Sequence, residues 1–277
     1  MNRQKSLAVL VCAALLAGCD YEKNAVQDIT APDPGSRIRF FNFGVNSPGV
    51  NFYANDTKVT AVSTATCVLP PASQTEPCTT TGAESTTGTG YGGVGLAGLY
   101  SALAPGQYTF TGRIAATTDK DLPISSVATA LTDGKYYSYY QSGFYNTTTK
   151  TVDAFVVEDA FPATIDYSVA HVRFVHAISN ASPMTLYATS TTIPGENAIG
   201  GEVAYKAGGA FTPLPGGPYN LATRYAGLTT NALTRTGVTF VAGRVYTITA
   251  RGDITVAPTT TACAAANRTC LDNTANR

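Results

Sequence analysis

Hydrophobic and polar residues alternate along several short stretches of the chain. In residues 107–114, Tyr108, Phe110 and Ile114 share one parity, and polar residues fill the other. A period of two with aromatic and β-branched residues is typical of a half-buried strand. The preceding Pro105-Gly106 is turn chemistry, because proline presets φ and glycine permits a positive φ. Beyond the N-terminal segment no long stretch shows a helical period, so we predict an all-β protein.

The same pattern occurs twice. Three blocks match in order: residues 37–43 with 171–177, 103–113 with 214–224, and 134–137 with 243–246. The offset shrinks along the chain, which places extra residues in the first copy, mainly between 66 and 98. We predict a tandem duplication and call residues 36–160 the first repeat and residues 168–277 the second repeat. Short strands separated by regular turns favour an antiparallel β-sandwich in each.

Four tyrosines fall in the predicted strand 135–143. The matching strand of the second repeat alternates apolar residues with threonines, so Tyr137 and Tyr139 are expected to face inward. Tyr136 and Tyr140 are then expected to face outward. Tyrosine offers a broad contact area at a small entropic cost. Tyr136 and Tyr140 are therefore our candidate contact face for an envelope protein or a glycan.

The N-terminus carries the three regions of an export signal in order. Arg3 and Lys5 are basic, residues 7–15 are apolar, and Leu16-Ala17-Gly18-Cys19 follows. The apolar run is shorter than the roughly 20 residues that span a bilayer, and it suits a signal peptide. Leu16-Ala17-Gly18-Cys19 resembles a bacterial lipobox. The alternative is an ordinary signal peptide that is cleaved nearby.

The lipobox resemblance implies that residues 1–18 are removed and that Cys19 is lipidated. Two or more acyl chains hold a protein stably on a membrane. We therefore expect a lipoprotein anchored to a membrane of the cell envelope, either the outer membrane or the periplasmic face of the inner membrane. Residues 19–35 are polar, with proline and glycine, and are expected to form a short tether.

Four cysteines remain in the mature chain: Cys67, Cys78, Cys263 and Cys270. An even number in an oxidising compartment is typical of disulfides. Three pairings are possible. The local pairs Cys67–Cys78 and Cys263–Cys270 are favoured because each pair brackets a polar loop. A zinc site is the rival interpretation, but the ten and six intervening residues exceed the usual ligand spacing.

The amino-acid composition excludes some classes of function. The chain has 277 residues with 18 Lys+Arg and 18 Asp+Glu, and this balance excludes the basic excess of a nucleic-acid binder. It has only two histidines. Several acids show no motif spacing: Asp119, Asp121, Asp153, Glu158 and Asp159. We therefore predict no enzymatic activity, no cofactor and no metal site.

Two segments of the second repeat resemble a known family. Val172-Arg173-Phe174-Val175-His176-Ala177 and Leu214-Pro215-Gly216-Gly217-Pro218-Tyr219 are similar to the opening and the turn of the domain-of-unknown-function 4397 family. The first repeat departs from the pattern, since Asn42 stands where the histidine is expected. The resemblance implies tandem Ig-like β-sandwiches in exported bacterial surface proteins, often lipoproteins. It implies no established activity.

Some polar residues recur at matching positions: Asn42 with His176, Arg39 with Arg173, and Arg113 with Arg224. Asparagine and histidine have similar hydrogen-bonding reach, so we favour a structural bond to a neighbouring loop. The arginines fit a repeated anion site, but we favour side chains packed over aromatic neighbours with paired or solvated heads.

These observations predict a membrane-anchored lipoprotein with a non-catalytic structural or binding role. A carbohydrate- or peptide-binding module of the cell surface is the first alternative. An envelope enzyme is the second, and it would need His176 clustered with Asp or Ser side chains in one pocket.

Overall fold

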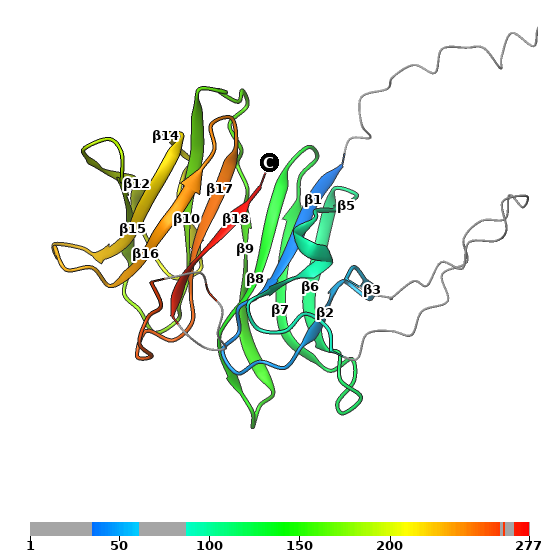
Figure 1. The fold of residues 1–277 in the computed structure, drawn as a ribbon. Coiled ribbons are helices and arrows are strands. Elements are labelled where there is room, and N and C mark those ends of the chain that lie inside the picture. Colours follow the sequence, from blue (N-terminus) through cyan, green and yellow to red (C-terminus); the bar gives the residue numbers. More distant parts are fainter. Residues whose placement is uncertain (1–34, 61–86, 261–262, 264–268, 277) are drawn as a thin grey trace, which may run out of the picture. The chain divides into compact units, whose positions relative to one another are not determined.

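The structure is a computed structural model that describes residues 35–60, 87–260, 263 and 269–276. The predicted signal peptide, Cys19, Cys67, Cys78 and nearly all of the tether lie outside these residues. The described chain is built from β-strands and one short 3₁₀ turn, η1 (Gly95–Gly98) (Figure 1). The predicted all-β class is therefore confirmed. Within this part of the chain, no helix has the length and apolar character needed to cross a bilayer.

The first repeat forms two sheets. Its strands are β1 (Ser36–Asn42), β2 (Val50–Ala54), β3 (Thr57–Lys58), β4 (Gly93–Val94), β5 (Ser101–Leu103), β6 (Gly106–Ile114), β7 (Pro123–Leu131), β8 (Tyr136–Asn146) and β9 (Thr151–Glu158). One sheet has the order β4-β1-β8-β9, with β5 also paired to β1, and the other has the order β3-β2-β6-β7.

The second repeat has the same topology. Its strands are β10 (Val169–Ala177), β11 (Met184–Ser190), β12 (Glu196–Val203), β13 (Ala207–Gly208), β14 (Thr212–Pro215), β15 (Gly217–Tyr225), β16 (Leu233–Phe240), β17 (Val245–Arg251) and β18 (Cys270–Ala275). The sheets run β13-β10-β17-β18, with β14 on β10, and β12-β11-β15-β16. Each strand thus has a counterpart in the first repeat.

One pairing in each repeat differs from the predicted antiparallel arrangement. β1 pairs with β8 in parallel, and β10 pairs with β17 in parallel, whereas the other ladders are antiparallel. Alternation along a single strand reports which residues share a face and does not report the direction of the neighbour. The parallel ladders place Arg39 opposite Ser138 and Arg173 opposite Thr247.

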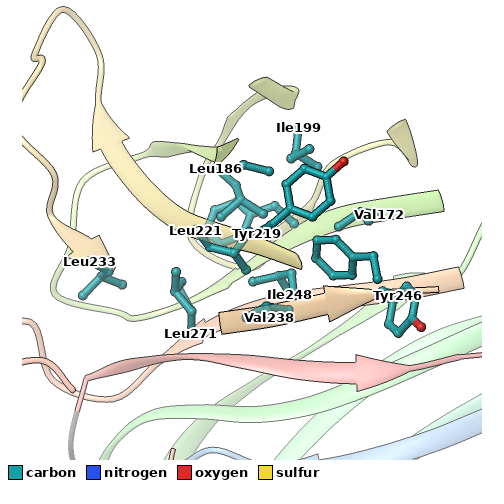
Figure 2. Packing of buried hydrophobic residues seen from close by; sticks show 14 of the residues in the cluster. Val172, Leu186, Ile199, Tyr219, Leu221, Leu233, Val238, Tyr246, Ile248 and Leu271 are labelled. Atoms are coloured by element: carbon teal, nitrogen blue, oxygen red, sulfur yellow. The ribbon is translucent and has the colours of Figure 1, made fainter. Parts of the chain in front are cut away.

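Each repeat encloses an apolar core between its two sheets. In the second repeat the core combines residues of β10, β17 and β18 with residues of β11, β12, β15 and β16 (Figure 2). Val172 and Ile248 come from one sheet, and Leu186 and Leu221 come from the other. Burying a side chain of this size contributes about 1.5–3 kcal/mol. This packing across two sheets is the predicted sandwich.

The tyrosines of β8 follow the predicted parity. Tyr137 and Tyr139 belong to the core of the first repeat, as expected. The prediction that Tyr140 forms an exposed contact face is wrong, because its side chain is completely buried. Tyr136 is half-buried against the rings of Tyr100 and Phe161. The outer face of this sheet is covered by residues of the second repeat, and alternation alone could not reveal that cover.

The second predicted local disulfide is present. Cys263 and Cys270 are bonded, with their Cα atoms 5.7 Å apart. Cys270 is the first residue of β18 and is buried. The bond therefore ties the segment before β18 to the strand that closes its sheet.

Candidate functional site

A third apolar cluster joins the two repeats, and we call it the junction cluster. It contains Phe41, Phe43, Tyr140 and Phe155 of the first repeat and Val175 and Ala177 of the second. The Tyr140 ring stacks on Phe41 at 4.7 Å and on Phe155 at 5.1 Å between ring centroids. Stacked aromatic pairs add to the energy of area burial. The residues on the outer face of β1, β8 and β9 are therefore buried in a further core between the two repeats.

A buried carboxylate lies beside this cluster. Asp159 follows β9, and its side chain has no exposed surface. Arg173 of the second repeat donates to its Oδ1. Ser138 and Tyr100 of the first repeat donate to its Oδ2 at 2.7 and 2.5 Å. The Arg39 Nε lies 3.9 Å from Oδ2. A buried charge is tolerated when it is paired and hydrogen-bonded in this way.

The two arginines make equivalent bonds within their own repeats. Arg39 Nε donates to Ser138 Oγ at 3.0 Å, and Arg173 Nε donates to Thr247 Oγ1 at 3.0 Å. In each case the acceptor lies directly opposite the arginine in the parallel ladder. The parallel pairing of β1 with β8 and of β10 with β17 therefore fixes the direction of both guanidinium groups.

Each arginine also reaches the end of the other repeat. Arg173 binds Asp159 and donates from Nη1 to the main-chain oxygen of Glu158 at 2.9 Å. Arg39 donates to Oδ1 of Asn276, which follows β18. Asp159 and Asn276 occupy matching places after the last strand of their sheets. The contact is reciprocal, and it clamps the repeats together through charged hydrogen bonds.

Aromatic rings cover both guanidinium groups. The Arg39 Cζ lies 4.8 Å from the Tyr100 ring centroid, and the Arg173 Cζ lies 4.9 Å from that of Phe211. Cation–π contacts of this kind stabilise desolvated arginines. Burial, and then the charge of Asp159, raises the pKa of Tyr100 well above its ordinary value, so its hydroxyl stays protonated and donates. The packed and paired arrangement that we favoured for these arginines is the one observed.

Further contacts cross the junction near Tyr205. Its hydroxyl lies 3.0 Å from Ser142 Oγ and 3.3 Å from Asp153 Oδ2. Lys206 Nζ is 3.1 Å from Asp153 Oδ2. Burial raises the pKa of Tyr205, which keeps this hydroxyl protonated. Arg251 of β17 stacks over Phe43 of the first repeat, with 5.1 Å from Cζ to the ring centroid.

His176 is a structural residue within the second repeat. The main-chain N–H of Ile178 donates to Nδ1 at 3.2 Å, so the neutral ring carries its proton on Nε2. Nε2 donates to the main-chain oxygen of Ser182 at 3.1 Å. Burial lowers the pKa of His176, and the bond to Ser182 opposes that shift. Both ring nitrogens are occupied in holding one loop.

Asn42 holds the corresponding loop of the first repeat. Its Oδ1 accepts from the Gly44 N–H at 3.2 Å, and its Nδ2 donates to the Pro48 oxygen at 3.3 Å. Nδ2 also donates to the Thr89 oxygen at 2.8 Å. Gly44 and Pro48 lie two and six residues after Asn42, the same spacing as Ile178 and Ser182 after His176. The expected structural bond to a neighbouring loop is confirmed.

The second pair of arginines is structural as well. Arg113 binds Asp56 at 3.0 Å and stacks on Tyr53 at 4.3 Å. Arg224 donates to both oxygens of Glu196, at 2.6 and 2.7 Å, and it covers the matching tyrosine of β11 in the same way. Each guanidinium already holds a carboxylate of its own repeat.

Two cavities flank the segment that follows β9. The smaller has a volume of about 250 Å³ and is lined by residues that include Lys135, Tyr136 and Phe161. The larger has a volume of about 560 Å³ and is lined by residues that include His171 and Phe211. In the described ranges no group of three or more His, Cys, Asp or Glu side chains is placed to hold a metal.

Residues 170–274 match the model of the family described as Domain of unknown function (DUF4397). The matched region contains β11–β17 and nearly all of β10 and β18. No curated protein matches the chain. Among solved structures, the Bacillus anthracis TIE protein is similar at 14% identity over 77% of this chain, with a TM-score of 0.22. This chain covers 32% of that structure.

The DUF4397 match supports the family resemblance of the second repeat and includes both Arg173 and His176. The structure brings the predicted residues Arg39, Arg173 and Tyr140 together at the junction. Tyr136 lines the smaller cavity. Sequence comparison missed Asp159 and Asn276 as partners, because the matching positions hold different residue types. Their shared place directly after the last strand is the signal that could have found them.

Proposed function

We propose that the chain is an exported, membrane-anchored bacterial lipoprotein with a non-catalytic structural or binding role at the cell envelope. The observation that carries this proposal is the use of the recurrent polar residues. Arg39, Arg173, Asn42 and His176 are buried and engaged in internal hydrogen bonds. Asp159 is enclosed by donors from both repeats. Side chains in this state support packing rather than proton transfer.

The proposed location of the protein is inferred from its N-terminal sequence. Leu16-Ala17-Gly18-Cys19 has the lipobox pattern behind a basic and an apolar region. The bonded Cys263 and Cys270 are consistent with export, because disulfides persist in oxidising compartments. Lipidated Cys19 would hold the repeats on a membrane, with residues 19–35 as the tether.

We further propose that the first repeat is a diverged second copy of the DUF4397 fold. The two repeats share their strand order, including the parallel ladder in each. Asn42 and His176 hold equivalent loops with bonds at the same spacing. Divergence of the first copy from the family pattern, as at Asn42, accounts for a match confined to the second repeat.

Lipidation is tested by mass spectrometry of the mature N-terminus in cells that express the full chain. We expect a diacylated or triacylated Cys19 and recovery of the protein in the membrane fraction. Cys19→Ser is expected to release the protein into the soluble fraction. An unmodified start at another residue would contradict the proposal. Proteolysis of intact cells then separates a surface location from a periplasmic one.

A cell-surface binding module for a carbohydrate or a peptide is the second candidate. The larger cavity at the junction favours it, because its volume lies in the range of small-molecule sites. The partner would then be an envelope glycan or protein. Glycan-array and peptide-array binding by the purified chain tests this candidate directly: no binding would count against it, and binding that survives a blocked cavity would place the site elsewhere.

A further inference from the structure

The larger cavity is open to solvent and is lined by three segments of the chain. The lining residues come from the end of β9 and the segment after it (Glu158, Ala160 and Pro162), from β10 (His171 and Arg173), and from the stretch between β13 and β14 with its two ends (Gly208, Gly209, Ala210, Phe211 and Pro213). Its volume of about 560 Å³ is large enough for a small organic ligand. Much of the wall is apolar, because it is formed by alanine, proline and phenylalanine side chains.

The charged groups on this wall already have partners. Arg173 binds Asp159 and the Glu158 oxygen. The Glu158 carboxylate accepts from Lys135 Nζ at 2.6 Å. A ligand therefore meets no uncompensated charge among these residues, and a neutral ligand fits them best.

His171 differs from these neighbours. Its side chain lines the cavity and is 8% exposed, and its Nε2 has no hydrogen-bond partner among the described groups. A buried polar atom without a partner is costly, and such atoms often mark a ligand or solvent site. One unpartnered imidazole nitrogen on a largely apolar wall matches a ligand with one hydrogen-bonding group.

The corresponding segment of the first repeat carries larger side chains. Leu96, Ala97 and Leu99 precede Tyr100 there, and the matching positions before Phe211 hold alanine or glycine. The Tyr100 hydroxyl binds Asp159, whereas Phe211 has no hydroxyl to do so. The second repeat thus keeps the ring over its arginine and has smaller side chains on the adjoining segment.

We propose that this cavity binds an aromatic ring that carries a single hydroxyl group, as in a free phenol or a tyrosine side chain. The apolar wall around Phe211 and Pro213 takes the ring, and His171 exchanges a hydrogen bond with the hydroxyl. The assignment names a ligand class for the cavity that favours the second candidate function, and it does not depend on lipidation or on membrane location.

The test compares p-cresol with toluene, two ligands that differ by the hydroxyl alone. The protein is the chain from residue 19 onward with Cys19→Ser, which keeps it free of lipid. Binding is followed by amide shifts in NMR spectra. We expect p-cresol to bind roughly three- to tenfold more tightly than toluene, which is the usual worth of one net hydrogen bond. Equal affinities, or no binding of either at millimolar concentration, would overturn the proposal.

Three variants assign the binding to this cavity. His171→Phe should abolish the preference for p-cresol, and His171→Gln, which keeps a hydrogen-bonding group, should retain part of it. Ala210→Trp should block both ligands by filling the cavity. Leu99→Trp is the matched control at the corresponding position of the first repeat and should leave binding unchanged. Binding that persists in folded Ala210→Trp protein would place the ligand elsewhere and refute the assignment.

N-acetyl-L-tyrosinamide separates the two sources of the ring. Affinity equal to or above that of p-cresol indicates a tyrosine side chain of a partner peptide. Weaker binding than p-cresol indicates a free phenol, because the flanking amides then clash with the cavity wall. Either result is read only after p-cresol has outcompeted toluene, so both support the phenol site.

Discussion

Asn42 and His176 make the same pair of loop contacts in their two repeats. Each accepts from the main-chain N–H two residues later and donates to the main-chain oxygen six residues later. An amide and a neutral imidazole both offer one acceptor and one donor at a similar separation. The two side chains are therefore interchangeable at this place in the fold, while only one of them titrates.

His176→Asn is expected to change the free energy of unfolding by no more than about 1 kcal/mol at neutral pH, because both loop bonds can re-form. His176→Leu is the control, and it should cost at least about 2 kcal/mol because it leaves two buried main-chain groups unpaired. Urea unfolding measures both values. A loss in the asparagine variant as large as that in the leucine variant would refute the equivalence.

The same substitution should reduce the acid sensitivity of the protein. Burial lowers the pKa of His176 in the folded state, so the unfolded chain binds a proton first as the pH falls. Stability is then complete above about 6.5, the ordinary histidine value, and declines as the pH falls through it towards the folded pKa. His176→Asn should flatten this part of the profile, and thermal midpoints between pH 5 and 8 follow it. An unchanged slope would show that other groups cause it.

Asp159→Ala should be among the most damaging single substitutions at the junction. It leaves the buried Arg173 without its counterion, and such losses cost about 3–5 kcal/mol. Asn276→Ala removes the matching neutral partner of Arg39 and should cost about 1 kcal/mol. Denaturant midpoints compare the two variants. Equal effects would mean that charge pairing is not what distinguishes Asp159.

Tyr140 separates packing from hydrogen bonding in the junction cluster. Tyr140→Ala removes a ring that stacks on Phe41 and Phe155, and it should cost about 3–5 kcal/mol. The Tyr140 hydroxyl is buried without a normal hydrogen bond to any described group. Tyr140→Phe should therefore change stability by less than about 0.5 kcal/mol, or increase it. Calorimetry distinguishes these outcomes, and a large loss in the phenylalanine variant would reveal a partner for the hydroxyl.

The Cys263–Cys270 bond closes a short loop before β18. Replacing both cysteines by alanine should lower the free energy of unfolding by about 2–3 kcal/mol on the chain-entropy model. Adding a reductant should lower the thermal midpoint of the parent chain to about that of the double variant. The midpoint of the double variant itself should change less. Equal sensitivity of the two proteins to the reductant would show that this bond is not the one responsible.

Alternation along the strands was sufficient to predict the β class and the inward direction of Tyr137 and Tyr139. It was not sufficient to predict the burial of Tyr140, because a period of two divides a strand into two faces and says nothing about what covers each face. Internal comparison found Arg39 and Arg173 as recurrent residues. The comparison did not find their partners Asp159 and Asn276. Each accepts a hydrogen bond from the arginine of the other repeat, but one is a carboxylate and the other an amide, so the two positions differ in residue type.

The reciprocal clamp has a consequence for inheritance. Arg39 is held by the tail of the second repeat and Arg173 by the tail of the first. A gene fragment that encoded one repeat alone would produce a sheet whose junction face is exposed to solvent. Its buried arginine would also lose its partner from the other repeat. Selection should therefore keep the two repeats on one chain, and a substitution directly after the last strand of either repeat should destabilise the other repeat as well.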